Sequence, residues 1–126
     1  MAEIRTLVVD DNECWLISIE NFLGRISGIQ LVGTAKDGVE ALAQVTALHP
    51  DLVIIDLVMP EMGGLEATKR LKAEPNAPRI VIVTIFCNPA YQNSACLAGA
   101  DGFIEKAEIY DKLPLLIQNL FPNTLV

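Results

Sequence analysis

The chain has 126 residues, 52% of them hydrophobic, which suits one domain with a sizeable core and excludes a disordered chain. Acidic residues outnumber basic ones 16 to 9, and the resulting net charge of −7 disfavours direct nucleic-acid binding by this chain. No apolar run approaches the roughly 18 residues of a membrane span and no signal-peptide pattern opens the chain, so we expect a soluble, cytoplasmic protein.

The first half of the chain alternates strand and helix patterns. Leu7–Val9 is a short, β-branched apolar run that predicts a buried strand. An amphipathic helix follows, with an apolar stripe formed by Leu16, Ile19, Leu23 and Ile26. Leu31–Ala35 is a weaker strand, as expected at a flanking position. Asp37 can then cap a second helix, and Glu40 three residues later completes a capping-box pattern.

The second half continues the same alternation. Leu52–Ile55 and Ile80–Val83 are unbroken apolar runs, typical of strands buried on both faces of a parallel sheet. Less distinct helices are expected near Gly64–Lys72 and Pro89–Leu97, and Gly102–Ile104 is a weak fifth strand.

The last predicted helix has apolar side chains at Leu113, Leu116, Ile117 and Leu120. Pro114 should fall in its first turn, because proline lacks the N–H that later helical positions donate. Five strand–helix units in succession predict an α/β fold with a doubly wound, five-stranded parallel sheet in the flavodoxin-like order 2-1-3-4-5. We expect a single domain over residues 1–126, with its core at about 4–120.

The cysteines and the histidine carry little functional signal. Cys14, Cys87 and Cys96 are odd in number and lack CxxC spacing, which argues against a disulfide framework and a thiolate zinc site. His49 precedes Pro50 at an expected helix end, where a surface or capping role is predicted.

Polar residues follow four of the predicted strands. Asp10 and Asp11 end the first, Asp56 the third and Thr84 the fourth, and Lys106 comes just after the fifth. The carboxyl ends of these neighbouring strands should meet at one edge of the sheet. Clustered carboxylates repel one another unless a cation intervenes, and oxygen-only ligands favour Mg²⁺ or Mn²⁺ over zinc. Singly, these residues are ordinary caps, strand ends or solvated charges; together they predict a phosphoryl-handling site with a carboxylate nucleophile.

This pattern resembles the receiver domain of two-component response regulators, from about Ile4 to Leu120. The residues that carry the resemblance are Val8-Val9-Asp10-Asp11, Asp56-Leu57-Val58-Met59-Pro60, Gly64, Thr84 and Lys106. The stretches Pro50–Glu66 and Gly99–Lys106 are especially similar to the NarL/FixJ (LuxR-type) branch of the CheY-like superfamily.

The resemblance implies a phosphorelay function. Asp56 corresponds to the phosphoacceptor, which receives a phosphoryl group from a sensor histidine kinase or a phosphotransfer protein. Asp11, Asp56 and the backbone carbonyl of Val58 correspond to ligands of Mg²⁺, and Asp10 to the acidic partner that orients metal-bound water. The chain would catalyse only its own phosphorylation and dephosphorylation.

The resemblance also implies a conformational switch. Lys106 and Thr84 correspond to groups that hold phosphoryl oxygens. Phe103 corresponds to the aromatic residue that turns inward when Thr84 follows the phosphate, although plain core packing is the alternative. The surface of the fourth helix, fifth strand and fifth helix would then change for an effector domain or protein. A homodimer formed on phosphorylation is left open.

Three features depart from the family pattern. Ala107, instead of a proline joined by a cis bond, follows the lysine, as is frequent in the NarL branch. Val58 and Ile85 place aliphatic groups at the mouth of the site, and we expect them to hinder water and slow loss of the phosphoryl group. The sequence ends soon after the fifth helix, which fits either a free-standing receiver or an excised domain of a NarL-type transcriptional regulator.

Two other functions fit less well. A phosphatase of the haloacid dehalogenase type needs a second aspartate two residues after the nucleophile, where Val58 stands. A flavodoxin-like cofactor binder needs a loop that cradles phosphate, but the loop after the first strand is Asp-Asp-Asn-Glu and would repel it.

Overall fold

Five parallel strands form the centre of the molecule, in the order β2-β1-β3-β4-β5. The computed structural model describes residues 3–86 and 88–122, so Cys87 lies outside the described residues. The strands are β1 (Ile4–Val9), β2 (Ile29–Ala35), β3 (Leu52–Asp56), β4 (Arg79–Thr84) and β5 (Gly102–Glu105). All five predicted strands and their predicted order are confirmed.

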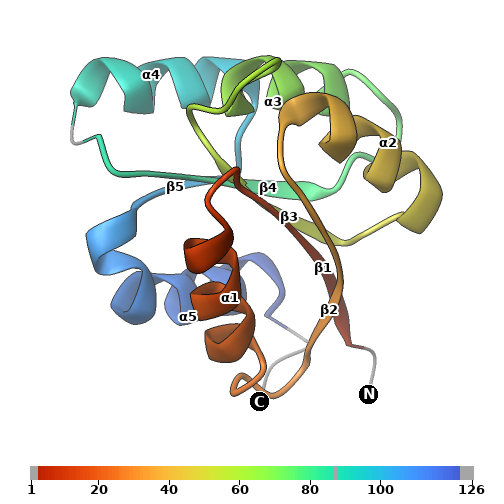
Figure 1. The fold of residues 1–126 in the computed structure, drawn as a ribbon, viewed down its shortest axis with the longest axis vertical. Coiled ribbons are helices and arrows are strands. Elements are labelled where there is room, and N and C mark those ends of the chain that lie inside the picture. The colour runs from red at the N-terminus through yellow and green to blue at the C-terminus, as the bar shows by residue number, and fades with distance from the viewer. Residues whose placement is uncertain (1–2, 87, 123–126) are drawn as a thin grey trace.

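Helices cover both faces of the sheet (Figure 1). One face carries α1 (Glu13–Leu23) and α5 (Ile109–Leu120), and the other α2 (Gly38–Leu48), α3 (Gly64–Lys72) and α4 (Pro89–Ala98). A short 3-10 turn, η1 (Lys106–Glu108), joins β5 to α5. No helix in the described ranges is long and apolar enough to span a membrane.

The central strands are buried on both sides, so their side chains divide into two cores. Val8 and Ile54 pack with α1 and α5, while Val9 and Ile55 pack toward α2 and α3. Alternation along each strand produces this division, because neighbouring residues point to opposite faces. The unbroken apolar runs of the sequence are explained by the two covered faces.

Side-chain caps begin the first two helices. Asp37 caps α2 as predicted, since its Oδ1 accepts a hydrogen bond from the Glu40 N–H at 2.8 Å. The cap of α1 is Asn12, whose Oδ1 accepts from the Trp15 N–H at 3.1 Å, so the alternative that Asp11 merely caps this helix is wrong. His49 is the left-handed C-cap of α2, with φ 49°, as its predicted capping role requires.

Two predicted helix boundaries are wrong. α5 begins at Ile109, so Pro114 lies inside the helix and not in its first turn. The proline removes one helical hydrogen bond, at a cost of about 3 kcal/mol. Burial of Ile109, Leu113 and Ile117, each at most 1% exposed, offsets that cost at about 1.5–3 kcal/mol per side chain. α1 ends at Leu23, so Ile26 lies beyond the helix, although it still packs against the core.

Candidate functional site

Three carboxylates meet at the carboxyl edge of the sheet. Asp10 directly follows β1, Asp11 comes next, and Asp56 is the last residue of β3. One oxygen from each lies within 4.8 Å of the others. Asp10 is fully buried, Asp56 is 9% exposed and Asp11 is exposed. The structure therefore brings together the three acidic residues that strand topology had predicted to be neighbours.

A close turn fixes the end of β3. The Gly64 N–H, at the start of α3, donates to the Leu57 carbonyl at 2.9 Å. A methyl group at Gly64 would overlap the carbonyl oxygen of Asp56, so only glycine lets α3 begin this close to the strand. The backbone of Asp56 is thereby held between β3 and α3.

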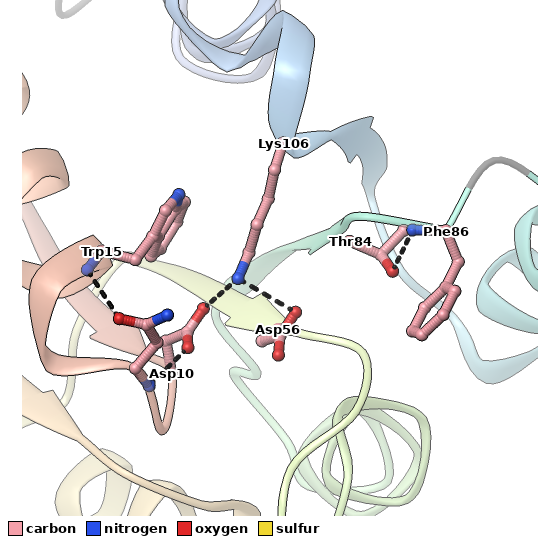
Figure 2. Close-up of polar contacts among 7 residues, drawn as sticks. Asp10, Trp15, Asp56, Thr84, Phe86 and Lys106 are labelled. Atoms are coloured by element: carbon pink, nitrogen blue, oxygen red, sulfur yellow. Dashed lines mark hydrogen bonds and ion pairs between the residues drawn. The ribbon is translucent and has the colours of Figure 1, made fainter.

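Lys106 reaches into the acidic cluster from the end of β5 (Figure 2). Its Nζ lies 2.7 Å from Asp10 Oδ2 and 3.6 Å from Asp56 Oδ1. The lysine side chain is only 14% exposed, so water screens these contacts weakly. The ammonium is thus bonded to Asp10 and lies close to Asp56.

Asp10 is held by both of its carboxylate oxygens. Oδ2 accepts from Lys106, and Oδ1 accepts from the Asn12 N–H at 2.8 Å (Figure 2). Asn12 was missed as a site residue, although an asparagine directly before a helix is a favoured N-cap and could have indicated it. Asp10 is consequently a fixed, fully paired carboxylate.

Asp56 is less well satisfied. Burial raises its pKa from 3.8 to about 6, with repulsion from Asp10 acting in the same direction and the Lys106 charge opposing it. The backbone N–H of the neighbouring Leu57 also lowers the pKa, but it does not restore the usual value. An additional cation near Asp56 would favour its charged form.

The remaining predicted residues lie at the ends of β4 and β5. Thr84 is buried, and its Oγ1 accepts from the Phe86 N–H at 3.0 Å (Figure 2). Phe103 pairs across the strands with Ile82, two residues before Thr84, so Thr84 and Phe103 occupy the same face of neighbouring strands. Phe103 is half-buried and lines a 170 Å³ cavity beside Ala95 of α4. Sequence reasoning had not identified the Phe86 contact.

Two aliphatic side chains lie on the loops beyond the strand ends. Val58 is 53% exposed and Ile85 is 71% exposed. Val58 stands two residues after Asp56, in the loop that leads to α3. The predicted metal contact of its backbone carbonyl stays a prediction.

The donor set of this edge suits a hard divalent cation. It consists of carboxylate oxygens from Asp10, Asp11 and Asp56, and the Lys106 ammonium beside them donates hydrogen bonds but has no lone pair for a metal ion. Because Asp11 is exposed, a cation bound here could keep water ligands, which suits Mg²⁺, since this ion retains several waters when bound.

The chain is similar to known signalling proteins over most of its length. Residues 6–118 match the model of the response regulator receiver domain family. The chain is 39% identical over 103 residues to the response regulator GacA of Pseudomonas viridiflava, covering 82% of this chain and 48% of that protein. It is 37% identical over 103 residues to the response regulator protein VraR of Staphylococcus aureus, covering 82% and 49%. The chain thus spans about half the length of these curated relatives.

A solved structure shares the fold. The signal receiver domain of the response regulator NarL from Mycobacterium tuberculosis superposes with a TM-score of 0.91 at 24% identity, over 98% of this chain and 99% of that one. The strand order, the acidic edge and the family match agree with one another, and the family match favours a receiver domain over the phosphatase and flavodoxin alternatives. This chain belongs to the response regulator receiver domain family of two-component signalling systems.

Proposed function

We propose that this receiver domain accepts a phosphoryl group on Asp56 from a phosphohistidine of a sensor kinase or phosphotransfer protein. One observation carries the proposal. Asp56, at the end of β3, is grouped with Asp10 and Asp11 and lies 3.6 Å from the Lys106 ammonium. A carboxylate surrounded by carboxylates needs nearby cations to attack an anionic phosphoryl group. This edge of the sheet supplies the Lys106 ammonium, and its acidic cluster has the oxygen ligands for a metal ion.

Receiver domains bind Mg²⁺ through an acidic cluster of this kind. Asp11 and Asp56 would be the side-chain ligands, with the Val58 carbonyl beside them and Asp10 supporting the set from the buried side. When bound, Mg²⁺ would neutralise charge on the carboxylates and on the incoming phosphoryl oxygens.

The transfer step needs a deprotonated Asp56. One carboxylate oxygen forms the bond to phosphorus while the phosphorus–nitrogen bond of the phosphohistidine breaks, and the electron pair of that bond stays on the imidazole nitrogen. The Lys106 ammonium, already 3.6 Å from Asp56, donates to a phosphoryl oxygen. The later hydrolysis of the acyl phosphate returns Asp56 to its starting state.

The signal would pass from Thr84 to Phe103. The Thr84 hydroxyl now accepts from the Phe86 N–H, and it is free to donate its own proton to a phosphoryl oxygen after rotating. Because Phe103 occupies the same sheet face one strand away, that rotation would change the space available to its ring. The surface of α4, β5 and α5 is the proposed contact for an effector domain or protein, and a homodimer formed on phosphorylation is a further prediction.

Phosphorylation by a small donor tests this function directly. The protein is incubated with Mg²⁺ and acetyl phosphate, and intact mass is measured before and after acid and hydroxylamine treatment. We expect one labile phosphoryl adduct, lost in Asp56→Asn and kept in the matched control Asp51→Asn, which changes an exposed aspartate directly before β3. An adduct that survives in Asp56→Asn, or none in the unaltered chain, would contradict the proposal.

A further inference from the structure

Trp15 lies against the ammonium group of Lys106. The distance from Lys106 Nζ to the centroid of the indole ring is 4.6 Å, within the range of a cation–π contact (Figure 2). The charged nitrogen therefore has the Asp10 and Asp56 carboxylates and the face of an aromatic ring as neighbours.

The ring is held in this place by the fold. The backbone N–H of Trp15 donates to the Asn12 side chain in the first turn of α1, and the indole packs half-buried against the core beneath α1 and α5. Asn12 also donates its own N–H to Asp10. One loop thus fixes both the aromatic and the carboxylate partner of the lysine.

This arrangement matters because lysine is long and strongly hydrated. A lysine side chain has four rotatable bonds and loses up to about 2 kcal/mol of rotamer entropy when it is ordered. An aliphatic residue at position 15 could fill the same space, but it would offer no negative ring face to a dehydrated ammonium. The indole both confines the ammonium and replaces part of its water.

We propose that Trp15 is a positioning residue that holds the Lys106 ammonium, partly dehydrated, beside Asp56 and ready for phosphoryl oxygens. This inference rests on the proposed phosphoryl transfer to Asp56. Loss of the ring face should leave the carboxylate cluster intact but weaken the grip of Lys106 on the phosphoryl group.

The test alters the electrostatics of the ring without altering its shape. Trp15 is the single tryptophan of the chain, so fluorinated tryptophans supplied during expression replace this residue alone. Each added fluorine depletes the negative face of the indole. We expect the rate of phosphorylation by acetyl phosphate to fall steadily from unmodified to trifluorinated tryptophan, by about three- to tenfold in all. Trp15→Phe should retain more of the rate than Trp15→Leu.

A second measurement isolates the contact from phosphorylation. Urea midpoints are compared across the fluorinated series in the native chain and in Lys106→Met. Fluorination should lower the midpoint of the native chain relative to that of Lys106→Met, because changes in hydrophobicity affect both backgrounds alike and cancel in the comparison. A rate that does not vary with fluorination while the native chain is phosphorylated would overturn the positioning role alone. If the native chain takes up no phosphoryl group, the proposed function falls with it.

Discussion

Replacing Asp56 by asparagine should stabilise the metal-free protein at neutral pH. Burial and then repulsion from Asp10 raise the Asp56 pKa from 3.8 to about 6, so the folded state binds this proton more tightly than the unfolded chain. Stability therefore falls as the pH rises from 3.8 to about 6, and it stays low at higher pH. A pKa shift of this size lowers the free energy of unfolding by about 3 kcal/mol at neutral pH. The amide has nearly the same shape and no charge to desolvate.

Urea unfolding in the presence of EDTA measures the effect. We expect Asp56→Asn to gain about 2–3 kcal/mol at a pH of about 7.5, and about half as much at a pH of about 5. Glu20→Gln, which removes an exposed charge on α1, should change stability by no more than about 0.5 kcal/mol. A gain of equal size at both pH values would refute the reasoning, because the cost of a buried charge must vanish as the carboxyl protonates.

Three further results are expected. Mg²⁺ should raise the urea midpoint of the native chain, and Asp11→Asn, at an exposed position, should remove most of that increase. Asp101→Asn should lower stability by about 1–2 kcal/mol in urea unfolding at neutral pH, because it weakens the contacts of Asp101 with Lys72 Nζ at 2.6 Å and the Ile80 N–H at 2.8 Å. Burial alone would raise the pKa of Asp101, but these contacts outweigh burial and lower the pKa below 3.8. The stability lost in Asp101→Asn should therefore shrink as the pH falls below about 3.8, where the carboxylate of the wild type becomes protonated. Val58→Asn should speed decay of the phosphoryl adduct followed by intact mass, and an unchanged decay would argue against shielding by this exposed side chain.

Most of the fold could be predicted because short-range patterns determine it. β1, β3 and β4 are apolar on both faces, which only a covered parallel sheet explains, and the alternation with helices then limits the strand order. The start of α5 could not be predicted in the same way. Pro114 favours a helix that begins near it, but burial of Ile109 in the tertiary core extends the helix one turn earlier.

The site could be predicted as far as backbone topology determines it. Asp10, Asp56 and Lys106 follow neighbouring strands, so their meeting follows from strand order. The contact between Trp15 and Lys106 depends on where two side chains point from different elements, and no sequence spacing encodes that. The Asn12 cap falls between these cases, because its residue type suggested a cap but its hydrogen bond to Asp10 depends on the loop.

Differences in pairing favour Asp56, among three clustered carboxylates, for the proposed acceptance of a phosphoryl group. Asp10 has both oxygens engaged, by Lys106 at 2.7 Å and the Asn12 N–H at 2.8 Å, so attack from it would break two charge-assisted bonds. Asp11 is exposed, so water competes for its oxygens. Asp56 is buried but lies 3.6 Å from the ammonium, and its pKa is raised by burial first and by repulsion from Asp10 second. A cation arriving with a phosphoryl group would offset this cost at the proposed nucleophile itself, so the free energy lost on burying Asp56 would be regained where the bond forms.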